Sequence, residues 1–147
     1  MYRRTFLESL GGLGLANMAN AGSTSAPGAR TAYYALQNYY LKNGTQLARI
    51  NEFMSRGLLP ALNAFHPGPK LFLEALVAPH MPQFAVLFGL RSLDQLAGMR
   101  ERLGADESFA KAFAGWEAGP EAPYEHFSQT ILKATEYSPE ISVASER

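Results

Sequence analysis

The strongest hydrophobic pattern in the chain is a tyrosine-rich run at residues 33–41. Four tyrosines, together with alanine and leucine, fill most of these positions, and this composition is typical of a β-strand. Asn43 and Gly44 follow and form a turn signal. We therefore expect the first strand of the fold here, with the downstream elements packed against it.

Apolar residues next recur at steps of three and four between Leu47 and Leu62, which predicts an amphipathic helix. Thr45 stands just before the first apolar position, where a capping residue belongs. Pro60 interrupts the pattern, so we expect a kink or a new helix start at residues 57–59.

Two further strands are expected at residues 70–78 and 83–90, separated by a turn that holds Pro79 and Pro82. Their apolar residues fall on both faces, unlike those of a sheet with one side in water. Because the connection between them is short, the two strands are expected to form an antiparallel hairpin.

A second helical region follows, and it contains three end signals. Ser92 and Gln95 have capping-box spacing, and Gly104 is placed to end this helix. Asp106 is placed to cap a further short helix. Residues 124–134 then predict a fourth strand.

The predicted order is strand, helix, strand, strand, helix, strand. This is the order of the α+β ferredoxin-like fold, βαββαβ, in which two helices cover one face of a four-stranded antiparallel sheet. The other face still carries large apolar side chains, and an exposed patch of that size marks an interface. We therefore expect a homodimer in which the two sheets face each other.

Composition narrows the classes of function. The chain has 147 residues, 47% of them hydrophobic, which suits one globular domain. Cysteine is absent, which excludes disulfides, thiolate metal sites and cysteine nucleophiles. The formal net charge is zero and no basic patch carries interleaved aromatic residues, so we expect no nucleic-acid partner.

Residues 1–21 predict a signal peptide. Arg3 and Arg4 precede an apolar pair, as in the bacterial twin-arginine signal. An uncharged run rich in glycine, alanine and leucine follows, and small residues offer a cleavage site between Ala21 and Gly22. A disordered basic tail and a mitochondrial transit peptide are the alternatives. Export would place the mature protein in the periplasm or outside the cell.

The rest of the chain divides into three parts. Residues 22–31 have the composition of a linker, residues 32–139 form the folded domain, and residues 140–147 are a C-terminal tail. The apolar run near the N-terminus is shorter than the roughly 18 residues that a bilayer requires, so we expect no permanent membrane span.

His126 is the candidate catalytic residue. It lies early in the fourth predicted strand, where alternation places it on the same face as Ser128 and Thr130. That face would line a cavity between two sheets, where a histidine acts as a base or a haem ligand; the alternative is a hydrogen-bonded structural histidine. His66 and His80 are expected at the surface or in turns, and no histidine has metal-site spacing.

Four further residues are candidates for binding a ligand. Gln37 would reach the cavity from the first strand, unless its neighbour Asn38, on the opposite face, does so instead. Tyr39 and Trp116 would stack on a planar molecule, or else close an aromatic core. Glu74 interrupts an apolar strand and is either buried with a partner or solvated at the rim.

The opening strand, the hairpin, the helix after it and the closing segment share a set of residues with one known family. These residues are Tyr34, Leu36, Tyr39, Leu41, Lys42, Gly44, Glu74, Pro82, Gln83, Phe84, Leu87, Ser92, Leu93, Leu103, Asp106, Phe109, Ile131, Leu132, Lys133, Ser138 and Pro139. With them the chain resembles the NIPSNAP family, and this resemblance implies a dimeric α/β barrel. Gln37 departs from the pattern, because the family commonly has arginine there.

The biochemical role of that family is poorly defined, and the wider superfamily of barrels includes cofactor-free monooxygenases and haem-handling enzymes. We expect an exported homodimer that binds a small apolar or aromatic molecule between its sheets, without a cofactor or a metal. The residues expected to hold it are Gln37, Tyr39, Glu74, Trp116 and His126. The alternative is a cofactor-independent monooxygenase-like enzyme, or a haem-handling one, that uses His126.

Overall fold

The computed structural model describes residues 30–143, so the predicted signal peptide, its cleavage site and most of the linker lie outside the described residues. The described elements are β1 (Tyr33–Tyr40), α2 (Gln46–Phe53), η2 (Met54–Leu58), α3 (Leu59–Asn63), β2 (Lys70–Glu74), β3 (Gln83–Leu90), α4 (Asp94–Ala105), α5 (Glu107–Glu117) and β4 (His126–Lys133).

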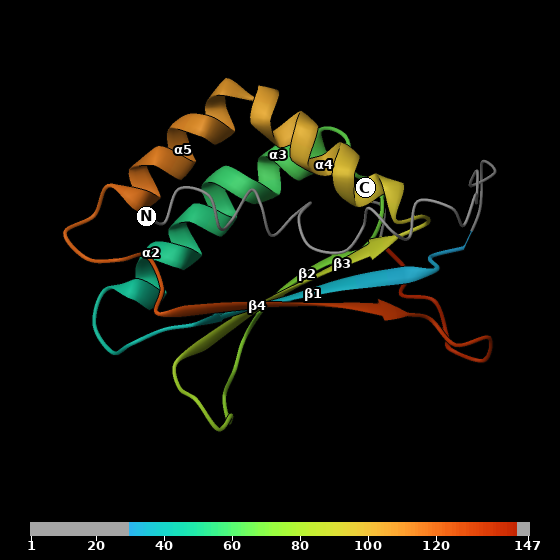
Figure 1. Ribbon diagram of the computed structural model, residues 1–147, viewed down its shortest axis with the longest axis horizontal. Coiled ribbons are helices and arrows are strands. Elements are labelled where there is room, and N and C mark those ends of the chain that lie inside the picture. Colours follow the sequence, from blue (N-terminus) through green and yellow to red (C-terminus); the bar gives the residue numbers. More distant parts are fainter. Residues whose placement is uncertain (1–29, 144–147) are drawn as a thin grey trace.

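The four strands form one antiparallel sheet in the order β2-β3-β1-β4. The helices lie together on one side of this sheet, and no described helix covers the other side (Figure 1). The prediction of an α+β ferredoxin-like fold with its helices on one face is therefore confirmed. The tyrosine-rich strand β1 lies in the interior of the sheet, hydrogen-bonded to β3 and β4.

An aromatic cluster fills the space between the sheet and the helices. Phe53 of α2 stacks on Trp116 of α5, with ring centroids 4.5 Å apart and planes 2° from parallel. Tyr39 of β1 meets the edge of Phe127 at 5.0 Å, which joins the sheet to the same cluster. Each such ring contributes about 1.5–3 kcal/mol on burial, so this cluster is a main source of the stability of the fold.

The interruption predicted at residues 57–59 is a π-helical stretch, η2, followed by a new α-helical start. Pro60 stands in the first turn of α3, directly after the π-helical stretch, and its lack of a backbone N–H removes one hydrogen bond at the place where the helical ladder changes from π to α. A Cβ on Gly57 would lie 2.8 Å from the Cβ of Ala112 on α5. Glycine at this position therefore lets η2 and α5 pack closely.

The helix ends agree only in part with the sequence predictions. Asp106 caps α5 as predicted, since its side chain accepts a hydrogen bond of 2.9 Å from the N–H of Phe109. Thr45 occupies the N-cap position of α2 as predicted, but its side chain makes no capping hydrogen bond. Ser92 does not cap α4, which begins at Asp94, and Gly104 lies inside that helix instead of ending it.

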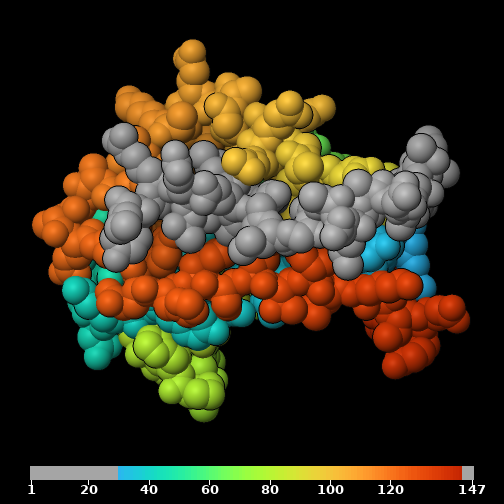
Figure 2. Space-filling model, in the orientation of Figure 1, coloured from blue at the N-terminus to red at the C-terminus, as the bar shows by residue number. Residues whose placement is uncertain are grey.

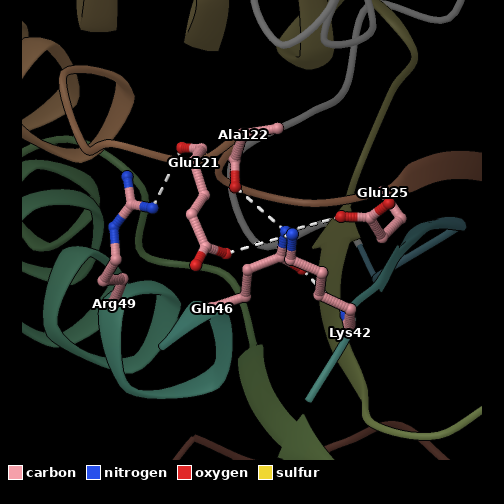
Figure 3. A network of polar contacts seen from close by, with 6 residues as sticks. All are labelled: Lys42, Gln46, Arg49, Glu121, Ala122 and Glu125. Atoms are coloured by element: carbon pink, nitrogen blue, oxygen red, sulfur yellow. Dashed lines mark hydrogen bonds and ion pairs between the residues drawn. The ribbon is translucent and has the colours of Figure 1, made fainter. Parts of the chain in front are cut away.

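Gln46 joins the start of α2 to the segment before β4, as Figure 3 shows. Its amide Nε2 is fully buried with the rest of the side chain and donates to the carbonyl of Ala122 at 3.0 Å and to the carboxylate of Glu125 at 2.7 Å. Its Oε1 accepts from the backbone N–H of Lys42 at 2.8 Å. This bond holds the turn after β1 against the helix.

Arg49, one helical turn further on, extends the same network (Figure 3). Its guanidinium donates to the carbonyl of Glu121 at 3.1 Å and to the carbonyl of Trp116. Lys42 forms an ion pair of 3.3 Å with the side chain of Glu121. The connection between α5 and β4 is thus tied to α2 by polar contacts at several points.

The strand β2 is shorter than predicted, because it ends at Glu74 and not at residue 78. Residues 75–82 form a loop that projects from the sheet on the side away from the helices (Figures 1 and 2). Leu76 and Val77 in this loop are 90% and 95% exposed. The apolar character of residues 75–78 predicts a longer strand. An apolar run does not by itself determine whether a residue pairs with a neighbouring strand.

Candidate functional site

The candidate site is the face of the sheet that carries no described helix, which we call the open face. Strand alternation divides β1 between the two sides of the sheet. The odd-numbered residues 35, 37 and 39 are buried against the helices, whereas the even-numbered residues are only half-buried. The register then assigns partners on the other strands to the same face.

One end of the open face is apolar. Leu36 of β1 lies opposite Leu87 of β3, and Leu87 lies opposite Leu71 of β2, so three leucines form a row across the sheet. Leu71 is 37% exposed and its neighbour Leu73 on the same face is 49% exposed. Leu132 of β4 adds a further exposed apolar side chain. This confirms the predicted exposure of large apolar side chains.

The other end of the open face is polar and centres on Tyr40. The ring of Tyr40 contacts the imidazoles of His80 and His126, with centroid distances of 5.4 Å in both cases. The hydroxyl of Tyr40 lies 3.5 Å from the hydroxyl of Ser128, and either group can donate. Two histidines and a tyrosine from three separate segments therefore gather at one corner of the sheet.

Between these ends lies a row that starts at Leu73 on β2 and continues with shorter side chains on β3, β1 and β4. Asn38 is opposite Ala85 on one side and Ser128 on the other. The side-chain oxygen of Asn38 accepts a hydrogen bond of 3.1 Å from Gln83. The amide and hydroxyl groups of this row therefore lie closer to the backbone of the sheet than the ends of the leucine and tyrosine side chains on either side.

Three of the predicted ligand-binding residues lie on the other side of the sheet. Gln37 and Tyr39 are fully buried beneath the helices and Trp116 is 4% exposed. Alternation is the physical reason, because odd positions of β1 all point toward the helical layer. Of Gln37 and Asn38, it is Asn38 that reaches the open face. Tyr39 and Trp116 lie in the aromatic core, which was the alternative interpretation for them.

Gln37 and Tyr39 instead belong to a buried polar chain within the core. Gln37 donates to Gln129 at 2.9 Å and accepts from the hydroxyl of Tyr39 at 3.4 Å. Burial raises the pKa of Tyr39 well above its usual value, and the charge on Tyr124 adds to the effect. This phenol is therefore held protonated and serves as a hydrogen-bond donor.

Glu74 is solvated at the rim, which was one of its two predicted positions. It is exposed and accepts a hydrogen bond of 2.6 Å from Asn51 of α2. It faces the helices and not the open face, because it pairs with the buried Phe84. Of the five predicted site residues, His126 is the one that the structure places on the open face, together with Ser128 and Thr130 as the alternation predicted.

Sequence reasoning missed Tyr40, His80 and Gln83 as members of the polar corner. Tyr40 could not be distinguished from Tyr39 in the sequence, because the pattern does not show which of the two side chains points to the open face. His80 was assigned to a turn, and it does lie in the loop after β2, where its Nε2 is 3.2 Å from the carbonyl of Leu41. Its proximity to Tyr40 depends on the path of that loop.

Residues 30–143 contain no cluster of three or more histidine, aspartate or glutamate side chains suited to holding a metal ion. In the same part of the chain, none of the helices is both long and apolar enough to cross a membrane.

The fold and the open face define a ferredoxin-like α+β protein in which no helix of residues 30–143 covers one face of the sheet. Among solved structures of similar fold is a NIPSNAP family protein of unknown function from Agrobacterium tumefaciens, with 20% identity, a TM-score of 0.61, and coverage of 76% of this chain and 96% of that one. A NIPSNAP-like domain protein from Burkholderia xenovorans shares 14% identity at a TM-score of 0.62, covering 80% and 97% of the two chains.

A third similar structure is a putative antibiotic biosynthesis monooxygenase from Nitrosomonas europaea, with 11% identity, a TM-score of 0.50, and coverage of 75% and 96%. No family model and no curated protein matches the sequence. At these identities the likeness concerns the fold, and the neighbours in structure agree with the family resemblance seen in the sequence.

Proposed function

We propose that the mature chain is an exported protein that dimerises through its open face and holds a small apolar or aromatic molecule between the two sheets. The observation that carries this proposal is the composition of that face. None of its strand positions is aspartate, glutamate, lysine or arginine, and its leucines lie beside the polar corner at Tyr40.

A second copy of the chain fits this surface better than an unrelated partner does. A two-fold axis brings the same patch of two subunits together, so like charges would repel across it. The open face has no such charges on its strands, and the row of Leu36, Leu71 and Leu87 offers apolar area to an identical row. Burying these leucines contributes about 25 cal/mol per Å² of apolar surface.

The row of short side chains supplies the room for a ligand. Packed sheets lie about 10 Å apart when their side chains interdigitate. Ala85 and Ser128 are too short to fill that distance, whereas the leucines and Tyr40 on either side are long enough to meet a partner sheet. A ligand here would contact apolar side chains and a few polar groups, chiefly Asn38 and His126, as small-molecule sites commonly do.

Native mass spectrometry of the periplasmic protein from an exporting host tests the proposal. Expression of the full chain should yield a dimer whose subunits begin at Gly22 and which carries additional non-covalent mass. Replacing both Arg3 and Arg4 by lysine should abolish export, because the twin-arginine pathway requires the pair.

Two variants distinguish a specific effect on the dimer interface from a general loss of stability. Leu73→Asp places a charge on the open face and should give a monomer at about 10 µM protein, because an unpaired charge is costly to bury. Ala110→Asp makes the same kind of change on an exposed position of α5, in the helical layer, and should leave the dimer intact. A monomeric wild-type protein, or equal behaviour of the two variants, contradicts the proposed interface.

The contact between Tyr40 and His126 supports a second candidate function. A histidine beside an aromatic surface is suited to remove a proton from a bound aromatic substrate, as a cofactor-independent monooxygenase of this fold requires. Oxygen consumption with the bound molecule, lost in His126→Ala while the dimer persists, would favour this enzyme. Haem handling would instead give a Soret band with haemin that depends on His126.

A further inference from the structure

A cavity lies away from the open face, at the end of the sheet where β1 begins and β3 ends. It has a volume of about 310 Å³ and we call it the strand-end pocket. Four segments that are far apart in the sequence line it: Thr31, residues 66–69, the end of β3 with the turn and the start of α4 after it (Gly89, Arg91 and Gln95), and residues 140–143. The pocket therefore exists only in the folded chain.

His66 was expected at the surface or in a turn, but it is instead buried and is a titratable group of this pocket. Only 4% of the residue is exposed, and its Nε2 atom has no hydrogen-bond partner within residues 30–143. A buried polar atom without a partner costs about 1–3 kcal/mol, so its presence calls for an explanation. A Cβ on Gly68 would lie 2.7 Å from the carbonyl oxygen of Gly89 and 2.9 Å from this nitrogen, so a residue larger than glycine would press on the ring.

The ring of His66 is neutral in the ligand-free chain. Burial lowers its pKa, the charge of Lys70 lowers it further, and the nearby carbonyl of Gly89 opposes both. Lys70 itself is held beside the ring because its Nζ donates to the carbonyl of His66 at 3.0 Å. The imidazole thus lies beside the positive charge of Lys70 and the carbonyl of Gly89.

The chain already stabilises one carboxylate in the wall of the pocket. The carboxylate of Glu140 accepts a hydrogen bond of 2.7 Å from the backbone N–H of Thr31. Hydrogen bonds from Thr31 lower the pKa of Glu140, and the charges of Arg30 and Arg91 lower it further. Arg30 and Arg91 therefore lie close enough to act on a carboxylate at this end of the sheet, and Arg91 is exposed and lines the pocket.

We propose that the strand-end pocket binds a small organic carboxylate, with the carboxylate held by Arg91 and the imidazole of His66. The apolar part of the ligand would lie against Pro69 and Ile141, which line the same cavity. A single arginine and one imidazole suit one negative charge. Glu140 acts as an internal competitor, because its carboxylate interacts with the same arginine.

The probe for this proposal is benzoate, compared with the neutral benzamide, on the full chain. Benzoate should shift the ring resonances of His66 in a saturable way, and benzamide should not. The chain has three histidines, so His66→Asn identifies the resonance that belongs to this one. Inorganic phosphate is the third probe and should bind more weakly than benzoate.

Two substitutions should move the affinity in opposite directions. Arg91→Gln should weaken benzoate binding at least about tenfold, since a hydrogen bond to a charged group contributes about that much. Glu140→Gln should strengthen it severalfold by removing the competing carboxylate. Arg100→Gln is the matched control, because it removes the same charge from an exposed position on α4 that does not line the pocket.

The pH dependence of benzoate affinity distinguishes a binding role of His66 from a purely structural one. Bound benzoate stabilises the protonated form of His66, so the complex holds a proton that the free protein lacks. Affinity should therefore rise as pH falls from about 7.5 to 6.5, by up to about tenfold per unit, while benzoate stays ionised. Lys70, Arg91 and Glu140 are the charged groups that face this site.

The proposal is overturned by any of four results. These are no saturable shift of His66 at about 10 mM benzoate, equal binding of benzamide, equal affinities of the Arg91 and Arg100 variants, and tighter binding of phosphate than of benzoate. The affinities do not depend on the open face, so a failure here leaves the proposed dimer unaffected.

Discussion

His66 links the pH of the solution to the stability of the folded chain. Its pKa is lowered in the fold, mainly by burial, from an ordinary value of 6.5. Below that value the unfolded chain takes up a proton at this position that the folded chain does not. Acidification through this range therefore favours unfolding, by at most about 1.4 kcal/mol per pH unit for one proton.

We predict that the stability difference between wild type and His66→Asn is largest near neutral pH and shrinks on acidification. The free energy of unfolding is measured with urea at pH 7.5, 6.5 and 5.5 for both proteins. Carboxylates such as Glu140 are the same in the two proteins and cancel in the comparison. Parallel curves over this range would show that His66 has no lowered pKa in the fold.

At the scale of elements, the starts of α2 and α5 show which predicted capping residues form a hydrogen bond in the fold. Asp106 caps α5 through a hydrogen bond, whereas Thr45 precedes α2 without one. We predict that Asp106→Ala lowers the free energy of unfolding by about 1 kcal/mol, the usual effect of losing such a cap. Thr45→Ala should change it by less than about 0.5 kcal/mol, as exposed positions without special contacts do.

Chemical denaturation of the two alanine variants provides the measurement. Equal losses of stability would mean that Thr45 also caps its helix in solution. The network around Gln46 explains why α2 can dispense with its own cap, because this side chain ties the start of the helix to the segment before β4.

The order and type of the elements were predictable because each rests on a local periodicity. All four strands and both helical regions were found at nearly the observed positions, including the interruption before Pro60. The prediction failed where a local pattern depends on distant contacts. Leu76 and Val77 resemble strand residues but have no paired position, and Gly104 resembles a helix end although α4 continues past it.

The candidate site was only partly predictable for a related reason. The position of His126 followed from simple alternation along β4. The choice between Gln37 and Asn38 did not, because each is an amide and each is flanked by a tyrosine nearby. Which of them is buried depends on the side from which the helices cover the sheet, and that is decided by the packing of the whole chain.

At the scale of the whole molecule, the loop of residues 75–82 extends beyond the open face (Figure 1). In the proposed dimer this loop would reach past the partner's sheet, and Leu76 and Val77 would lose their exposure there. Burying a side chain of this kind contributes about 1.5–3 kcal/mol. The loop would then contact the partner subunit and stabilise the dimer.

We predict that the double variant Leu76→Ser, Val77→Ser weakens the dimer at least about tenfold, which corresponds to about 1.4 kcal/mol. Sedimentation over a range of protein concentrations measures this effect. The stability of the monomer should not change, because both side chains are exposed in the single chain. An unchanged dissociation constant would place the loop outside the interface.

The central strand β1 is composed of like pairs: Tyr33 with Tyr34, Ala35 with Leu36, Gln37 with Asn38, and Tyr39 with Tyr40. A slip of one residue in one direction would therefore give each odd-numbered, helix-facing position a similar side chain, so the pattern of that face gives little resistance to it. The even-numbered positions would change in character, and backbone bonds from Ala32 to Leu90 and from Leu41 to Pro82 continue the observed alignment beyond both ends of the strand. A strand with equivalent side chains on both faces has the composition of one packed on both sides.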